Sequence, residues 1–539
     1  MNFVIVADAD MYTGTGHLMR CLALAQEIKQ KGHEASFITY CDSEKLCQKI
    51  RTEGFPIHVL GKLDNLTEAM EILNTEKPDW VILDGYHFGT DYQKWVKDSG
   101  CRLLVVDDYA HLRHYYSDII LNQNYAAEKL SYRTETCTEF LLGTQYALLR
   151  KEFFSGAGRK REFPEIGRNI AVTMGGGDAE NNTFTIVKAL NQIKQPLHIK
   201  IVMGASNPHY DSIRNEAGKG AHTAEILTSV SNMASIISWA DLGISAGGIT
   251  TWELAFLGLP SLLFIVAENQ EETVKALAVD GFFLSPGWFR GTTVREIKEM
   301  TEKLILDKNL RKMLSEKSRT LVDGKGAVRV FNAMRKMPIR ILFLGGHMSR
   351  QLADWLESQG ETVLYTEEKI DQKAAEKFNP DLVISYNYRH IVKGDFLSIP
   401  KRGAINLHIS YLPWNRGAHP NVWSFIDNTP KGVTIHYMDE GIDTGDILLQ
   451  REVQIYETKE TLKSSYGILH TEIQNLFKAH WVAIKSGELG PKAQIDPGTI
   501  HCRKDGVLFQ KLIAQRGWDI PINEFKEEII SVKQHGSCV

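Results

Sequence analysis

The chain has 539 residues, of which 43% are hydrophobic and 24% charged, and it carries a formal net charge of -4 at pH 7. This length exceeds what one hydrophobic core supports, so we expect about three compact units. The composition is that of a globular protein, with no apolar run near the roughly 20 residues that span a bilayer and no basic block for binding nucleic acid.

The N-terminus runs directly into an apolar stretch, Phe3–Val6, that ends at Asp8. A signal peptide begins with basic residues, so we expect the chain to stay in the cytoplasm.

The seven cysteines are scattered and include no C-x-x-C pair. This pattern argues against a disulfide framework or a zinc knuckle and favours reduced, mostly structural thiols.

Short apolar runs alternate with helix-period stretches and predict α/β units around parallel sheets. The runs lie at Phe3–Val6, Trp80–Leu83, Leu103–Val106, Ile170–Met174, Ile199–Met203, Leu242–Ser245 and Ser261–Val266. A polar stretch at 155–168 resembles a linker, a charged segment at 302–336 resembles a domain-closing helix, and a third start follows at Pro338. We therefore predict units at 1–155, 168–336 and 338–490, with a short tail at 491–539.

A glycine-rich turn, Gly14-Thr15-Gly16-His17, follows the first expected strand and opens a helix. Such turns allow close backbone approach, and the helix N-terminus favours an anion. The glycines alone fit a simple tight turn equally well. His17 favours a site, because a titratable residue at the mouth of a parallel sheet sits where α/β folds bind ligands.

Two more glycine-rich strand ends occur in the second unit, at Gly175–Asp178 and at Gly247-Gly248. We expect both to face one cleft. The amides from Gly247 to Thr250 would then hold a diphosphate, and Glu253, one helical turn further on, would accept hydrogen bonds from ribose hydroxyls.

Together these motifs, with Val106-Asp107-Asp108 and Gln270, resemble the two-lobed glycosyltransferase-B fold, and more closely the UDP-sugar hydrolases of pseudaminic acid biosynthesis. The resemblance covers about residues 1–336. It implies that UDP lies on the second lobe and that His17 is the base for water attacking the anomeric carbon, with inversion and without a metal. The UDP-sugar site it implies comprises Gly16, Arg20, Tyr86, Gly176, Gly247, Gly248, Glu253 and Gln270. Asp107, Asp108 and Asn122 are interpreted as strand-end caps.

The third unit carries a second constellation. Asn406 and His408 lie two residues apart on an expected strand, so their side chains point to the same side. About 35 residues on, an acidic, glycine-punctuated loop contains Asp443. Transfer of an acyl group to an amine needs donors for the oxyanion and a route for the amine's proton, and this set offers both.

These residues, with Ser410-Tyr411-Leu412-Pro413 between them, resemble the formyltetrahydrofolate-dependent formyltransferases over about residues 339–489. The resemblance implies a Rossmann-like domain that uses N10-formyltetrahydrofolate as formyl donor. Asn406 and protonated His408 would stabilise the oxyanion, while Asp443 tunes His408 and positions a relay water. The loop Tyr388, Arg389, His390 and Ile391 would hold the pterin. Ile409 replaces the proline that many members have after the histidine, which leaves the acceptor open.

The region after Gly490 has seven basic and six acidic residues, which is no platform for tRNA. A UDP-linked amino sugar is therefore the expected acceptor. The family picture suggests formylation of the 4-amine of UDP-2-acetamido-4-amino-2,4,6-trideoxy-altrose, followed by UDP release, on the way to a formamido pseudaminic acid. A legionaminic-type isomer is an alternative. The N-terminal half is alternatively a glycosyltransferase or a nucleotide-sugar binding module. We expect no nucleic-acid or membrane partner.

Overall fold

The computed structural model describes residues 1–10, 14–62, 66–156, 158, 160–204, 207–228, 230, 232–346, 348–392, 394–495 and 497–535. The chain divides into two compact units, Met1–Met334 and Arg335–Val539. Within the described ranges, no helix is both long and apolar enough to cross a membrane.

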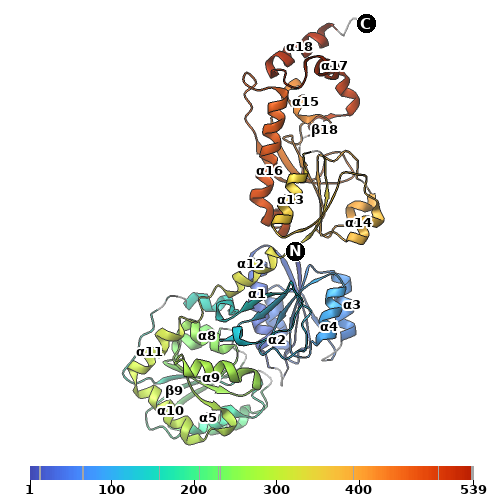
Figure 1. The fold of residues 1–539 in the computed structure, drawn as a ribbon. Coiled ribbons are helices and arrows are strands. Elements are labelled where there is room, and N and C mark those ends of the chain that lie inside the picture. The colour runs from blue at the N-terminus through green and yellow to red at the C-terminus, as the bar shows by residue number, and fades with distance from the viewer. Residues whose placement is uncertain are drawn as a thin grey trace. The chain divides into compact units, whose positions relative to one another are not determined.

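The first lobe of the first unit is a seven-stranded parallel sheet in the order β3-β2-β1-β4-β5-β6-β7. Helices lie on both sides of it, with α1 and α2 on one side and α3 and α4 on the other (Figure 1). The elements are β1 (Asn2–Ala7), α1 (Gly16–Gln30), β2 (Glu34–Thr39), α2 (Glu44–Thr52), β3 (Ile57–Val59), α3 (Leu66–Glu76), β4 (Trp80–Asp84), α4 (Thr90–Asp98), β5 (Arg102–Val106), β6 (Ile119–Asn122), η1 (Ala127–Lys129), β7 (Glu139–Leu142), η2 (Thr144–Tyr146) and η3 (Lys151–Gly156).

The second lobe is a six-stranded parallel sheet in the order β10-β9-β8-β11-β12-β13. Its elements are β8 (Asn169–Thr173), α5 (Asn182–Leu190), β9 (His198–Met203), α6 (Tyr210–Ala217), β10 (Thr223–Thr228), α7 (Met233–Trp239), β11 (Leu242–Ala246), α8 (Thr250–Leu257), β12 (Ser261–Ile265), η4 (Glu268–Gln270), α9 (Glu271–Val279), β13 (Leu284–Trp288), η5 (Phe289–Gly291), α10 (Val294–Leu306), α11 (Lys308–Ser318) and α12 (Gly326–Lys336). The central strands of both lobes are buried, as their uninterrupted apolar runs require, and the predicted α/β fold with parallel sheets is confirmed.

The charged segment 302–336 is three helices rather than one. Asp307 ends α10 and caps α11 by accepting a hydrogen bond from the Leu310 amide at 2.9 Å, so the chain turns there. After a second break, α12 returns to the first lobe, where the Phe331 ring lies 6.3 Å from that of Phe3.

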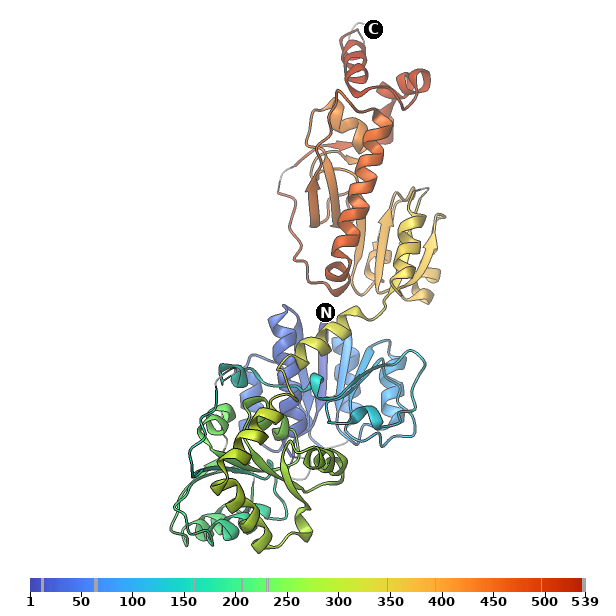
Figure 2. The same ribbon diagram turned by 60° about the vertical axis from the view of Figure 1, so that its left-hand side comes forward.

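The second unit has a mixed six-stranded sheet in the order β15-β14-β16-β17-β19-β20, in which β17, β19 and β20 pair antiparallel. The long helix α16 runs alongside the sheet, and the last two helices lie beyond one of its ends (Figure 2). The elements are β14 (Arg340–Leu344), α13 (Arg350–Ser358), β15 (Thr362–Thr366), α14 (Gln372–Phe378), β16 (Leu382–Tyr386), η6 (Gly394–Ser398), β17 (Ala404–His408), β18 (Arg416–Gly417), α15 (Pro420–Ile426), β19 (Gly432–Tyr437), β20 (Ile447–Glu452), α16 (Leu462–Ser486), β21 (Ile500–His501), η7 (Arg503–Gly506), α17 (Val507–Arg516) and α18 (Ile522–His535).

The region after Gly490, expected as a tail, is folded. Its helices α17 and α18 bury Phe509, Ile522 and Phe525 against Trp423 and Leu462 in a small core of their own. The short strand β21 pairs in parallel with β18, which follows β17 in the chain. The sequence did not predict this core because the apolar residues of 491–535 pack partly against α15 and the start of α16.

Candidate functional sites

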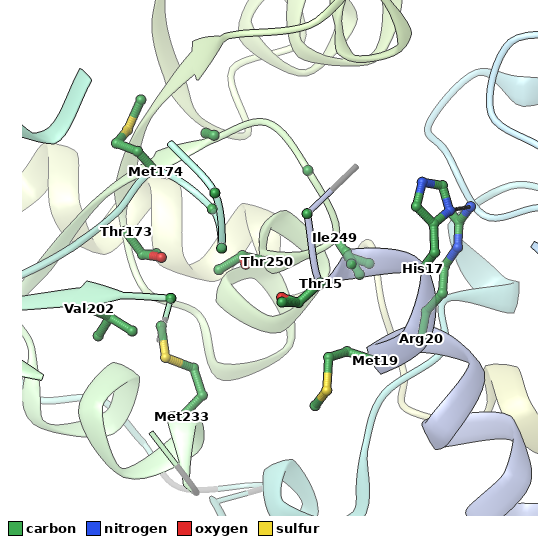
Figure 3. Close-up of a pocket in the computed structure, with 18 of the residues that line it drawn as sticks. Thr15, His17, Met19, Arg20, Thr173, Met174, Val202, Met233, Ile249 and Thr250 are labelled. Carbon is green, nitrogen blue, oxygen red and sulfur yellow. Dashed lines mark hydrogen bonds between the residues drawn. The ribbon is translucent and has the colours of Figure 1, made fainter. Parts of the chain in front are cut away.

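A large cleft lies in the first unit, with a cavity volume of about 1470 Å³. Glycine-rich turns from both lobes line it, as do His17, Tyr86 and Glu253. Thr15, at the N-terminus of α1, lies next to Ile249 and Thr250 of the other lobe (Figure 3). A Cβ atom on Gly176 would lie 2.9 Å from Thr15 Oγ1, so the turns of the two lobes are in close contact. The sequence expected these turns to face one cleft, and the fold brings them together.

His17 is held by Asp84, the last residue of β4. Its Nδ1 lies 2.5 Å from Asp84 Oδ1, and because a carboxylate only accepts, Nδ1 carries the proton of this contact. In the neutral ring Nε2 then has a free lone pair. Since His17 lines the cleft and Asp84 is fully buried, the arrangement presents a fixed imidazole that can accept a proton from a ligand in the cleft.

Arg20 lies beside His17 on α1 (Figure 3) and is buried between two carboxylates. It donates to Asp84 Oδ2 from Nε at 2.6 Å and to Asp108 Oδ1 from a terminal nitrogen at 2.9 Å. Burial alone would raise the pKa of Asp84, but Arg20 and His17 together hold that pKa well below its usual range. Arg20 therefore keeps Asp84 ionised, and its guanidinium is already satisfied by protein partners.

Tyr86 links the two lobes. Its hydroxyl donates to Asp108 Oδ2 at 2.6 Å and accepts from Asn269 Nδ2, also at 2.6 Å. The Tyr86 ring meets the His17 ring edge-on, with centroids 5.0 Å apart. Burial and the neighbouring Asp108 raise the pKa of Tyr86, so its hydroxyl stays protonated. Asn269 of the second lobe is therefore hydrogen-bonded to Tyr86, the residue whose ring packs against His17.

The three residues interpreted from the sequence as strand-end caps, Asp107, Asp108 and Asn122, do not all have the same role in the structure. Asp107 accepts from the Tyr109 and Ala110 amides and from the Tyr115 and Tyr132 hydroxyls at 2.7–3.0 Å, so it holds the loop after β5. Asn122 also serves the backbone, since its Oδ1 accepts from the Asn124 amide. Asp108 instead contacts Arg20 and Tyr86 in the cleft. The sequence did not predict the contacts of Asp84, Asp108 and Asn269 with His17, Arg20 and Tyr86, because the order of the strands, which places the end of β4 beside β1, is seen only in the structure.

On the second lobe, Gly247 and Gly248 precede α8 at the edge of the cleft. A Cβ atom on Gly247 would lie 2.1 Å from Val274 Cγ2, which explains the glycine. Gln270 Oε1 accepts from the Val266 amide at 3.0 Å and so fixes the loop after β12. Glu253 lies in the cleft, where its carboxylate accepts from Arg150 at 2.7 Å. Burial raises the pKa of Glu253, and Arg150 opposes that shift.

In the second unit, Asn406, His408 and Asp443 come together. Asn406 Nδ2 donates to Asp443 Oδ1 at 3.1 Å, and His408 Nδ1 lies 3.6 Å from Asp443 Oδ2. The Gly417 amide donates to Asp443 Oδ2 at 2.8 Å. Burial would raise the pKa of Asp443, but His408, His436 and the Gly417 amide hold it well below its usual range.

His408 is buried, and its Nε2 lies 3.3 Å from the carbonyl oxygen of Asn415. Burial lowers the pKa of His408, and Asp443 opposes that shift only in part. Burial thus favours the neutral form of the resting imidazole, and the protonated His408 that the resemblance implies belongs to the stage at which the oxyanion forms.

His436 is a further member of this cluster that sequence reasoning did not single out. It lies directly opposite Asn406 in the β17–β19 pair, with Nε2 at 3.3 Å from Asn406 Nδ2 and at 3.5 Å from Asp443 Oδ1.

Among the described residues, no group of three or more His, Cys, Asp or Glu side chains is arranged to hold a metal ion.

Residues 356–479 match the family model described as Formyl transferase. The formyltransferase PseJ from Anoxybacillus kamchatkensis, solved in complex with UDP-4,6-dideoxy-4-formamido-L-AltNAc and tetrahydrofolate, is 44% identical in a match that covers 34% of this chain and 97% of PseJ, with a TM-score of 0.33. Sequence identity over nearly all of that protein decides the family. The chain belongs, through its second unit, to the formyl transferase family.

The formyltransferase unit is also similar to the GDP-perosamine N-formyltransferase of Brucella melitensis, at 32% identity over 151 residues, which are 28% of this chain and 56% of that protein. The chain thus spans little more than half the length of that relative.

The loop after β16 was expected to hold the pterin. Its Tyr388 hydroxyl donates to the backbone carbonyl of Glu368 at 2.7 Å. Arg389 pairs with the Glu368 carboxylate, His390 lies beside Tyr388, and Ile391 is 70% exposed.

The first unit has different relatives. Residues 169–321 match the model described as Glycosyltransferase family 28 C-terminal domain. The spore coat polysaccharide biosynthesis protein SpsG of Bacillus subtilis is 26% identical over 333 residues, which are 61% of this chain and 96% of that protein. The chain is therefore a fusion of a two-lobed glycosyltransferase-like region with a formyltransferase unit.

Proposed function

We propose that the chain formylates the 4-amine of a UDP-2-acetamido-4-amino-2,4,6-trideoxyhexose with N10-formyltetrahydrofolate and then hydrolyses the formylated UDP-sugar to release UDP. The observation that carries the proposal is the Asn406–His408–Asp443 cluster in a unit 44% identical to PseJ. The sugar in the PseJ complex favours the altrose type over a legionaminic-type isomer. The product would be a precursor of a formamido pseudaminic acid.

The formyl donor supplies an activated one-carbon acyl group. The residues present suit it, since the polar side chains of Asn406 and His408 lie together beside the Asp443 carboxylate, which is largely shielded from solvent. The loop Tyr388–Ile391 would hold the pterin mainly through its backbone, because its Tyr388 and Arg389 side chains are bound to Glu368.

During transfer, the sugar amine bonds to the formyl carbon, the bond from that carbon to N10 breaks, and the amine's proton moves to the leaving nitrogen. The side-chain NH2 of Asn406 donates a hydrogen bond to the developing oxyanion. His408, neutral at rest because burial lowers its pKa, accepts the amine's proton. Asp443 lies 3.6 Å from His408, a separation that a relay water would bridge, and it stabilises the charged imidazole as it forms.

For the hydrolase activity, His17 Nε2 takes a proton from water as the water oxygen bonds to the anomeric carbon and UDP leaves. Asp84 orients the ring and stabilises the imidazolium. The amides at the start of α8 would meet the diphosphate charge, and Glu253 would exchange Arg150 for the ribose hydroxyls. One positioned base suffices because UDP is then a good leaving group.

A second candidate for the first unit is glycosyl transfer, which the match to a glycosyltransferase family model favours. Incubation of the UDP-amino sugar with the formyl donor, followed by mass analysis of the products, tests both readings. Hydrolysis predicts free formamido sugar and UDP without any acceptor. Formylated UDP-sugar that persists until an acceptor is added supports the transferase instead, and formylation without UDP release under any condition leaves a binding module.

A further inference from the structure

The chain after α16 returns to the catalytic loops of the formyltransferase unit. We call Lys492–Gln494 and Pro497–His501 the strap. At one end the Lys492 amide and carbonyl pair with those of Ile447 at 2.8–2.9 Å, close to the loop that carries Asp443. At the other end β21 pairs with β18. The strap therefore runs alongside the loops that flank His408.

Gln494 joins two of these loops through its side chain. Its Nε2 donates to the carbonyl of Asp443 at 2.9 Å and to the carbonyl of Gly445 at 2.8 Å. Its Oε1 accepts from Arg416 at 2.6 Å. Both the NH2 and the oxygen of the amide are thus used, and the backbone at Asp443 and two residues after it is tied to Arg416, the residue before Gly417.

Thr499 holds the other neighbour of His408. Its hydroxyl accepts from the Asn415 amide at 2.8 Å, and its carbonyl accepts from the Arg416 amide at 2.9 Å. The carbonyl of Asn415 is the group that contacts His408 Nε2 at 3.3 Å. The strap therefore positions the partners of both ring nitrogens, Asp443 at Nδ1 and Asn415 at Nε2.

The strap is packed too closely against the loops to be a loose extension. Gly498 has φ +59°, and a Cβ atom there would lie 2.0 Å from the Pro413 carbonyl oxygen. His501 is fixed by a parallel stack on Trp423, with centroids 3.9 Å apart, and by Asp427 at 2.8 Å. Small residues at the contacts and an aromatic anchor beyond them hold the strap in one register.

We propose that Gln494 is a positioning residue for formyl transfer, which sets the Asp443 loop against His408, so that residues after α16 complete the formyltransferase site. This inference rests on the proposed formyl transfer at that site. It assigns a role to a region that the sequence reading left as a tail.

The test compares the full chain with Gln494→Ala, Gln494→Glu and the control Ile495→Ala, whose side chain is 97% exposed. Formyl transfer from N10-formyltetrahydrofolate to the UDP-linked 4-amino sugar is followed. Gln494→Ala should lower kcat by about 10²-fold with KM nearly unchanged, because a misplacement of about 1 Å costs that much. Gln494→Glu keeps the acceptor for Arg416 but sets a carboxylate against two carbonyls, so it should lose as much. Ile495→Ala should equal the parent.

Two readouts separate positioning from mere stability. In Gln494→Ala the limb of the pH profile that reports His408 should move to lower pH, because the carboxylate that opposes the effect of burial is displaced. The same shift should appear in the His408 titration followed by NMR of histidine-labelled chain, with His408→Asn assigning the signal. The NMR titration needs no acceptor sugar. If the parent chain showed no formyl transfer, the proposed function would be contradicted, but the titration would still test whether Gln494 positions Asp443 against His408. Parent-like kcat and an unmoved His408 titration in Gln494→Ala would overturn it.

Discussion

His17 Nδ1 lies 2.5 Å from Asp84 Oδ1, and the same carboxylate is held by Arg20 at 2.6 Å. The contact joins the helix after β1 to the end of β4, which is the neighbouring strand in the sheet. The His17 imidazole is therefore oriented by a contact with the sheet itself. Substitution of Asp84 therefore tests the same site as substitution of His17.

Asp84→Asn should reduce UDP release by about 10²–10⁴-fold, because an amide no longer fixes the imidazole tautomer or stabilises the imidazolium. Formyl transfer by the same preparation should be unchanged, since its residues lie in the other unit. The thermal unfolding of the first unit should move to lower temperature, because Arg20 loses one of its two buried partners. UDP release at the parent rate would show that His17 does not depend on Asp84.

His17→Asn should stop UDP release and let the formylated UDP-sugar accumulate, which nucleotide-sugar chromatography would measure. Little effect on folding is expected, because Arg20 retains both carboxylates. A variant that releases UDP as fast as the parent would make His17 structural, and another base would have to be found in the cleft.

His408→Ala should lose formyl transfer by a factor of about 10²–10⁴, the usual contribution of one acid–base group. UDP release from a pre-formylated UDP-sugar should persist in the same variant. Measuring both reactions on one preparation makes each the folding control of the other. Near-normal formyl transfer would refute the assignment of His408.

The acid stability of the formyltransferase unit should depend on His470, which is buried in α16 with Nδ1 at 2.6 Å from the Tyr386 hydroxyl. Burial lowers the pKa of His470 from 6.5 to about 4. As pH falls through 6.5 the unfolded chain takes up a proton that the folded chain does not, until pH reaches about 4. The free energy of unfolding should therefore fall across this window by up to about 3 kcal/mol.

His470→Gln should flatten this part of the pH dependence, measured by denaturant unfolding at pH values from 7 to 4. His480→Gln, on the same helix but only half-buried, is the matched control and should leave the slope in place. Equal slopes in the parent and in His470→Gln would remove His470 as the source of the acid sensitivity.

The strand pattern could be predicted well because buried parallel strands are uninterrupted apolar runs, and Phe3–Val6 and Leu242–Ser245 both lie inside observed strands. The neighbours Asn406 and His408 were also predictable, since the period of a strand sets them on one side. The partners of His17 were not, because Asp84 is 67 residues away and only the sheet order brings it near. The strap was missed for the same reason, since Gln494 carries no local signal of its contact with Asp443.

The order of the two reactions is the most direct test of the account. A free 4-amine is partly protonated near neutral pH, and burying an ammonium without a partner is costly, whereas formylation leaves a neutral amide. Formylation first also keeps the UDP group available for binding to the formyltransferase unit. The decisive measurement is a time course of UDP release from the UDP-amino sugar with and without N10-formyltetrahydrofolate. We expect little UDP until the donor is added and release that follows formylation thereafter, and UDP that appears equally fast without the donor would contradict the account.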